Sequence, residues 1–70
     1  MNQRQRILQY IRDFGSITPM QAFNDLGVTR LAARISELIE SGYNIKKEYV
    51  GGKNRYGEKV YFMRYSLGGD

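Results

Sequence analysis

Hydrophobic residues recur at helical spacing in three successive stretches of the first 42 residues. Steps of three and four residues place such positions on one side of a helix. The apolar positions are Ile7, Leu8, Ile11 and Phe14 in the first stretch, Ala22, Phe23 and Leu26 in the second, and Leu31, Ile35, Leu38 and Ile39 in the third. A glycine closes each stretch: Gly15, Gly27 and Gly42. The pattern predicts three short amphipathic helices packed on one core.

The second and third stretches also carry residues that start helices. Thr18 is a favourable N-cap, Pro19 suits the first helical position, and Gln21 completes a capping box with Thr18. Thr29 is the N-cap expected for the third helix. Two short helices joined by a turn that contains Gly27 form a helix-turn-helix pattern.

From residue 43 onward the hydrophobic period changes from helical to alternating. Residues 43–50 and 59–67 are rich in β-branched and aromatic side chains, which predicts two strands. Between them the sequence GGKNRYGE is polar and glycine-rich, as a hairpin loop requires. The face expected to pack on the helices consists of Tyr61, Met63, Tyr65 and Leu67, with Ile45 and Tyr49 from the paired strand. Ser16 and Ile17 are expected to form a short extended link with one bridge.

Three helices followed by a two-stranded antiparallel hairpin predict an α+β fold, mainly α, of the winged helix-turn-helix type. The sequence shows no internal repeat and no interdomain linker. A chain of 70 residues has room for one small core. We therefore expect one domain over residues 1–67, followed by a disordered tail at residues 68–70.

The composition argues against several kinds of chemistry. The chain has no cysteine and no histidine, so it lacks the residues of disulfides, zinc–thiolate sites and the commonest general base. Its acidic residues are scattered, and no histidine is present to activate its serines. We therefore predict no catalytic residue, no metal site and no cofactor. Because no apolar run approaches the length of a membrane span, we expect no membrane association and a cytoplasmic location.

Two regions are candidates for binding an anionic partner, which the formal net charge of +4 favours. One is the polar face of the third helix and the other is the tip of the hairpin. The candidate DNA-binding residues are Thr29, Arg30, Ala33, Arg34 and Glu37 on the helix, and Lys53, Asn54 and Arg55 on the hairpin. Considered separately, each region is better explained as an ordinary solvent-exposed surface without a binding role. A cationic helix followed by a basic hairpin makes nucleic-acid contact the better interpretation.

The helix residues have distinct expected roles in the major groove of DNA. Arg30 or Arg34 is expected to make a bidentate contact to guanine, and Thr29 to donate to a phosphate. Ala33 is small enough to allow close approach of the helix. Glu37 either accepts a hydrogen bond from cytosine or forms an ion pair with a neighbouring cation, and we favour the ion pair.

Residues 17–50 and 53–67, ITPMQAFNDLGVTRLAARISELIESGYNIKKEYV and KNRYGEKVYFMRYSL, resemble the small winged helix-turn-helix proteins of phage and prophage genomes. The likeness extends from Ile7 to Leu67 and is also shared, more distantly, with winged-helix domains of bacterial repressors. It implies binding of double-stranded DNA, a role in transcription or phage development, and a location at the bacterial nucleoid. Since no further helix remains to build a large dimer interface, we expect a monomer or a weak dimer formed on DNA.

The alternative is a winged helix that binds another protein. Its interface would use exposed aromatic side chains, and the candidates are Tyr43, Tyr49, Tyr56 and Phe62. A small domain also uses such residues to close its core. Substitutions of Arg34 or Arg55 should weaken binding to DNA, whereas substitutions of Tyr56 or Phe62 should weaken binding to a protein.

Overall fold

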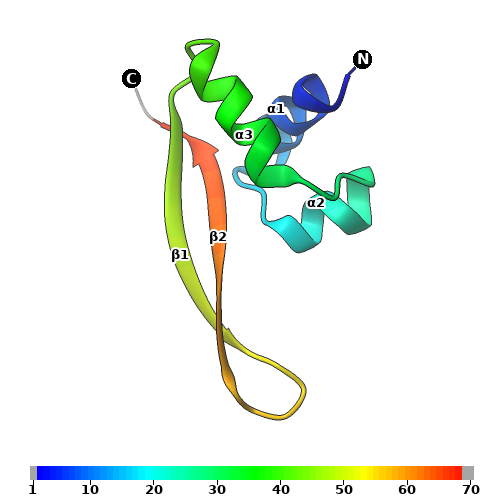
Figure 1. Ribbon diagram of the computed structural model, residues 1–70, viewed down its shortest axis with the longest axis vertical. Coiled ribbons are helices and arrows are strands. Elements are labelled where there is room, and N and C mark those ends of the chain that lie inside the picture. Colours follow the sequence, from blue (N-terminus) through cyan, green and yellow to red (C-terminus); the bar gives the residue numbers. More distant parts are fainter. Residues whose placement is uncertain (1, 69–70) are drawn as a thin grey trace.

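The computed structural model, which describes residues 2–68, consists of three helices followed by one antiparallel hairpin (Figure 1). The elements are α1 (Gln3–Phe14), α2 (Pro19–Leu26), α3 (Leu31–Glu40), β1 (Ile45–Lys53) and β2 (Lys59–Leu67). This arrangement confirms the predicted fold class and the order of its elements.

Capping boxes start the first two helices. The Thr18 hydroxyl accepts from the Gln21 backbone N–H at 3.2 Å, and the Gln21 side chain accepts from the Thr18 N–H at 3.0 Å. Asn2 and Gln5 make the same pair of hydrogen bonds at the start of α1. Each box satisfies two N–H groups that have no partner within the helix. The box at Thr18 confirms the sequence prediction, whereas the one at Asn2 was not predicted.

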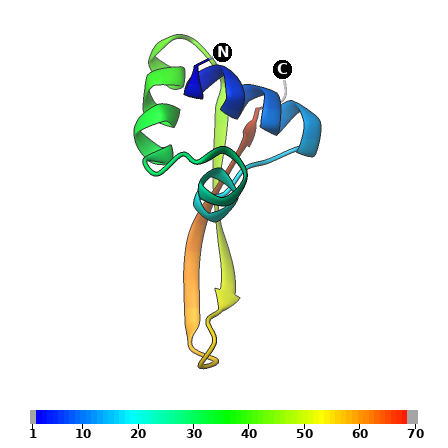
Figure 2. The ribbon, with the colours of Figure 1, turned by 90° about the vertical axis from the view of Figure 1, so that its right-hand side faces the viewer.

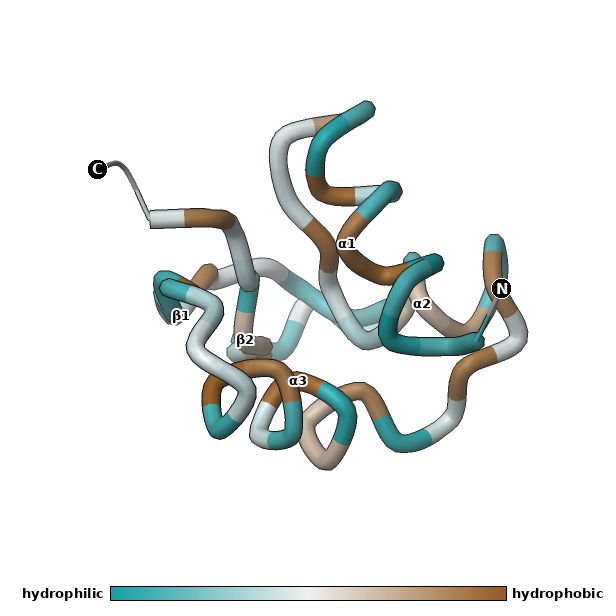
Figure 3. Tube along the Cα trace, turned by 90° about the horizontal axis from the view of Figure 1, so that it is seen from above, coloured by the Kyte–Doolittle hydropathy of each residue, from teal (hydrophilic) through white to brown (hydrophobic). Residues whose placement is uncertain are grey.

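The core lies between the three helices and the near end of the hairpin. Hydrophobic and hydrophilic segments alternate along α1 and α3, as a helix with one buried side requires (Figure 3). The buried residues are Ile7, Leu8, Ile11, Ile17, Ala22, Val28, Leu31, Ile35, Leu38, Ile45 and Tyr65. Nine of these eleven come from the helices and the segments that join them, and the other two, Ile45 and Tyr65, come from the hairpin.

Ile17 ties the hairpin to the helices. It forms an isolated antiparallel bridge with Tyr65, in which each backbone N–H donates to the other residue's carbonyl at 2.8 and 2.9 Å. The Ile17 side chain is completely buried and the Tyr65 side chain nearly so. Burial raises the pKa of the Tyr65 hydroxyl, and the neighbouring Tyr49 adds to the shift. The extended link with one bridge is confirmed.

Several apolar residues predicted for the core are exposed instead. Phe14 is 71% exposed and Phe23 is 57% exposed, and Ile39 is also exposed. Phe14 is the last residue of α1, where its ring lies beside that of Tyr10, with 4.7 Å between ring centroids. Phe23 and Ile39 lie one position around their helices from Ala22 and Leu38. With so small a core, each helix buries a stripe narrower than its apolar face.

The hairpin is longer than predicted. The strands pair from Ile45 opposite Leu67 to Lys53 opposite Lys59, so the loop comprises residues 54–58 rather than 51–58. Figure 2 shows the far half of the hairpin extending well beyond the helices. Tyr49 and Tyr61 are exposed, which corrects the prediction that they pack on the helices.

Only one residue of the expected tail at 68–70 is described. The Gly68 N–H donates to the Asn44 carbonyl at 2.7 Å, which continues the chain beside the start of the hairpin. Residues 69 and 70 lie outside the described residues, as does residue 1 of the expected domain.

Candidate nucleic-acid interface

Helix α3 starts without a side-chain cap. Arg30 occupies the N-cap position, at φ −124° and ψ 60°, and makes no capping hydrogen bond. Thr29 precedes it in the turn, so the prediction of Thr29 as the N-cap is wrong. Both residues are exposed. The first N–H groups of α3 are therefore left without the side-chain acceptor that Thr18 provides to α2, and an uncapped helix start attracts anions.

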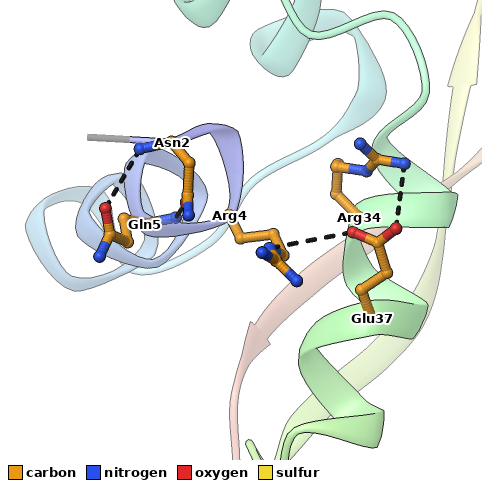
Figure 4. Close-up of polar contacts among 5 residues, drawn as sticks. All are labelled: Asn2, Arg4, Gln5, Arg34 and Glu37. Carbon is orange, nitrogen blue, oxygen red and sulfur yellow. Dashed lines mark hydrogen bonds and ion pairs between the residues drawn. The ribbon is translucent and has the colours of Figure 1, made fainter.

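Two ion pairs that share Glu37 connect α3 to α1. The Arg34 Nη2 atom lies 3.1 Å from the Glu37 Oε2 atom, and the Arg4 Nε atom of α1 lies 3.9 Å from Glu37 Oε1 (Figure 4). The predicted ion pair of Glu37 is confirmed. Arg34 is half-buried, and its Nε atom is buried with no hydrogen-bond partner in the described part of the chain. Its guanidinium therefore lies against the body of the protein rather than projecting from it.

The outward surface of α3 is small and partly acidic. Ala33 is half-buried, and Glu37 lies on the same side of the helix. Ala32, Ser36 and Glu40 are exposed. Arg30 stands at the start of this surface and takes part in no ion pair within residues 2–68. Of the two arginines predicted to read guanine, Arg30 is the one whose charge is not already paired.

Asn54 organises the hairpin loop. Its Oδ1 atom accepts from the backbone N–H groups of Tyr56 at 2.9 Å and Glu58 at 3.0 Å, and its Nδ2 atom donates to the Glu58 carboxylate at 3.0 Å. Gly57 closes the loop with a φ of 78°. Asn followed three residues later by Gly is a turn signal, so this role could have been predicted. Lys53 and Arg55, the other two predicted tip residues, are exposed.

The strand register divides the hairpin into two faces. The inner face, which carries the buried Ile45 and Tyr65, comprises the odd-numbered residues from Ile45 to Lys53 and from Lys59 to Leu67. The outer face comprises the even-numbered residues between the same limits. Sequence reasoning treated the basic residues of the hairpin as one group. The period-two alternation was the signal that could have separated them.

The start of α3 faces the side of the helical body from which the hairpin extends. In both Figure 1 and Figure 2, α3 begins at its lower end, and the hairpin extends downward from the helices. The residues that begin α3, with Arg30 at the N-cap, therefore belong to the end of the helix nearer to the projecting hairpin. This is the arrangement that two contacts to one extended partner require.

A tyrosine–aspartate contact joins α1 to α2 away from these regions. The Tyr10 hydroxyl donates to the Asp25 Oδ2 atom at 2.5 Å. This hydrogen bond, with smaller contributions from desolvation and the Asp25 charge, raises the pKa of Tyr10. Within residues 2–68 no group of three potential metal ligands is present, and no helix there is long and apolar enough to cross a membrane.

Three helices followed by a two-stranded antiparallel hairpin are the architecture of a winged helix-turn-helix domain. The sequence model of the family described as "Winged helix-turn-helix domain" matches residues 2–68 of the chain. The chain therefore belongs to this family, and membership indicates DNA binding. No match to a curated protein or to a solved structure was found.

Proposed function

We propose that this protein binds double-stranded DNA in a sequence-specific manner and acts as a small regulator of transcription or phage development. The observation that carries this proposal is that the uncapped start of α3 lies on the side of the helical body from which the basic hairpin extends. A B-DNA major groove is wide enough to admit an α-helix. With α3 in the groove, the hairpin extends along the backbone or the adjacent minor groove. The bacterial nucleoid is the corresponding location.

The predicted residues take separate roles in this complex. Arg30 reads a guanine edge, and Thr29 donates to a phosphate beside the uncapped start of α3. Ala33 allows the helix to approach the base edges. Lys53 and Arg55 contact the DNA backbone. The remaining candidates support these contacts: Arg34 and Glu37 through their ion pair, and Asn54 through the loop.

The salt dependence of binding tests the proposal. If about four phosphates are neutralised, the logarithm of the association constant should fall with the logarithm of the salt concentration at a slope near −3.6, from about 0.9 per phosphate. Fluorescence anisotropy with a labelled duplex measures this slope. Selection from a random pool of duplexes should then enrich one motif. A flat salt response contradicts DNA binding, and a steep response without enrichment contradicts sequence specificity.

Glu37→Gln is expected to strengthen non-specific binding to DNA. The substitution removes the negative charge that Arg4 and Arg34 share. Both arginines then become available to phosphate, and the salt slope should steepen by up to about 1.8, from about 0.9 per added contact. Glu40→Gln, an exposed glutamate on the same helix with no ion pair in the described residues, is the control. Equal effects of the two substitutions would mean that net charge alone, not release of the arginines, determines the change.

A protein-binding role is the second candidate because aromatic and apolar side chains are exposed on the body and the hairpin. Tyr56 is 85% exposed at the hairpin tip. On α2, Met20 and Phe23 border a depression of about 410 Å³. If this role is the correct one, Tyr56→Ala and Phe62→Ala should reduce partner binding with little dependence on salt. Arg55→Glu should then have the smaller effect, the reverse of the expectation for DNA.

We further propose that the protein is a monomer in solution or a weak dimer that forms on DNA. Specific helix-turn-helix regulators pair on half-sites about 34 Å apart, but residues 2–68 contain no additional helix that could build a separate dimer interface. Sedimentation velocity over a range of concentrations measures the state. A dimer that persists at every concentration would contradict this part of the proposal alone.

A further inference from the structure

The basic residues of the hairpin are not evenly divided between its two faces. The inner face carries Lys47, Lys53 and Lys59 and no acidic residue. On the outer face, Arg64 is paired with Glu48, which leaves Lys46 as its unpaired cation among the strand residues. A polyanion is therefore attracted to the inner face, which is also the face turned toward the helices.

Two of these lysines lie directly opposite one another. Lys53 and Lys59 form the last pair of the strand register, on the same face of the hairpin. Opposed side chains in an antiparallel pair have Cβ atoms about 4.5–5.5 Å apart, and like charges at that separation destabilise the pair. Neither lysine forms a salt bridge within residues 2–68. An anion seated between the two ammonium groups would relieve the repulsion.

Beside the lysine pair the strand contains glycines that the fold itself does not need. Gly51 and Gly52 lie in β1 and have no positive φ. A Cβ added at Gly51, on the inner face, would meet only the ring of Tyr61, at 3.5 Å, which is an ordinary contact. One added at Gly52, on the outer face, would meet only the ring of Phe62, at 3.6 Å, so Gly52 borders the inner face through its backbone alone. A glycine inside a strand with no conformational requirement often marks close approach of a ligand or another backbone.

These residues border one shallow depression. A hollow of about 320 Å³ on the hairpin is lined by Gly51, Gly52, Lys53, Lys59 and Tyr61. Tyr61 is 69% exposed and supplies a hydroxyl donor and an aromatic wall. Two cations, a donor and an open stretch of backbone are the groups that hold a phosphodiester.

We infer that this notch, defined as Gly51, Gly52, Lys53, Lys59 and Tyr61, seats one phosphate of the DNA backbone between the two lysines. The inference rests on the proposed function and deepens it. It adds a contact on the inner face next to the loop, separate from the contact proposed for Arg55 at the tip. Because a phosphate carries no sequence information, the contribution of this contact is independent of DNA sequence.

The double substitution Lys53→Ala/Lys59→Ala tests the notch. Removal of one phosphate contact should reduce the magnitude of the salt slope by about 0.9, measured with a short random-sequence duplex. Since the repulsion between the lysines is also removed, the unfolding midpoint at low salt should stay the same or rise. Lys46→Ala/Arg12→Ala removes the same charge from the outer face and from α1, and should leave the slope nearly unchanged.

Gly51→Ala gives a second, independent measurement. The added methyl group fits the strand but occupies the notch, so the unfolding midpoint should be kept while the affinity for the duplex falls.

An unchanged salt slope in the lysine double variant, or equal losses in that variant and its control, overturns the inference while DNA binding by the wild-type protein stands. If the association constant of the wild-type protein does not depend on salt, the proposed function itself is contradicted. A lower unfolding midpoint that accounts for the lost binding would assign the lysines a structural role and also overturn the inference.

Discussion

Ile17→Ala is expected to lower the free energy of unfolding by about 2–5 kcal/mol, the range for truncating a large aliphatic side chain in a core. Ile17 is completely buried and lies where the helices meet the hairpin. Its backbone hydrogen bonds to Tyr65 survive the substitution, so the loss comes from packing. In a domain of this size such a loss lowers the melting temperature by at least about 8 °C. Thermal unfolding followed by circular dichroism measures it.

Phe14→Ala is the control for Ile17→Ala, since the same apolar pattern predicted Phe14 for the core. Phe14 is exposed and contacts the ring of Tyr10. The loss should therefore be confined to that aromatic pair, about 0.5–1.5 kcal/mol. Equal losses at the two positions would contradict the packing described for α1 and for the link before α2.

Local signals in the sequence were sufficient to predict which helices and strands this fold contains. Thr18, Pro19 and Gln21 form a capping box that depends only on neighbouring residues, and it is present as predicted. Gly15 and Gly27 adopt the left-handed conformation that ends α1 and α2. Such features can be read from sequence because the groups that satisfy the backbone lie within four residues of one another.

Burial could not be predicted to the same extent, because it depends on neighbours from other elements. Phe23 and Ala22 belong to one apolar stripe, yet Ala22 is buried and Phe23 exposed. Tyr65 and Tyr61 share one face of β2, but the helices reach only Tyr65. The periodicity identifies which residues share a face, and the length of the covering element decides how many of them are covered.

In the candidate site, too, local features could be predicted from the sequence, whereas contacts between separate elements could not. Exposure of Arg30, Lys53 and Arg55 agrees with their proposed contacts. The contact between Glu37 and Arg4 was harder to anticipate, because Arg4 belongs to a separate helix. The pairing of Arg34 with Glu37 and the hydrogen bonds of Asn54 are local by comparison. A charge or amide seen in a sequence is available to a ligand only if the fold has not already satisfied it.

Arg30→Ala is expected to produce the largest loss of sequence-specific DNA binding among the helix substitutions. Arg30 is exposed at the start of α3, and its charge is unpaired within residues 2–68. A bidentate arginine–guanine contact gives about 1–3 kcal/mol of discrimination, or about 5- to 150-fold in affinity. Affinity for the motif obtained by selection should fall by this factor, as measured by anisotropy. Arg34→Ala should cost less, since Arg34 is held by Glu37.

Arg30→Lys separates base reading from charge at this position. Lysine keeps the positive charge but lacks the planar fork that matches guanine. Binding to a random-sequence duplex should therefore be nearly that of the wild-type protein, while discrimination in favour of the selected motif is lost. Full discrimination by the lysine variant would restrict Arg30 to a phosphate contact. A larger loss of specificity from Arg34→Ala would mean that Arg34 leaves its ion pair with Glu37 and reads the base instead.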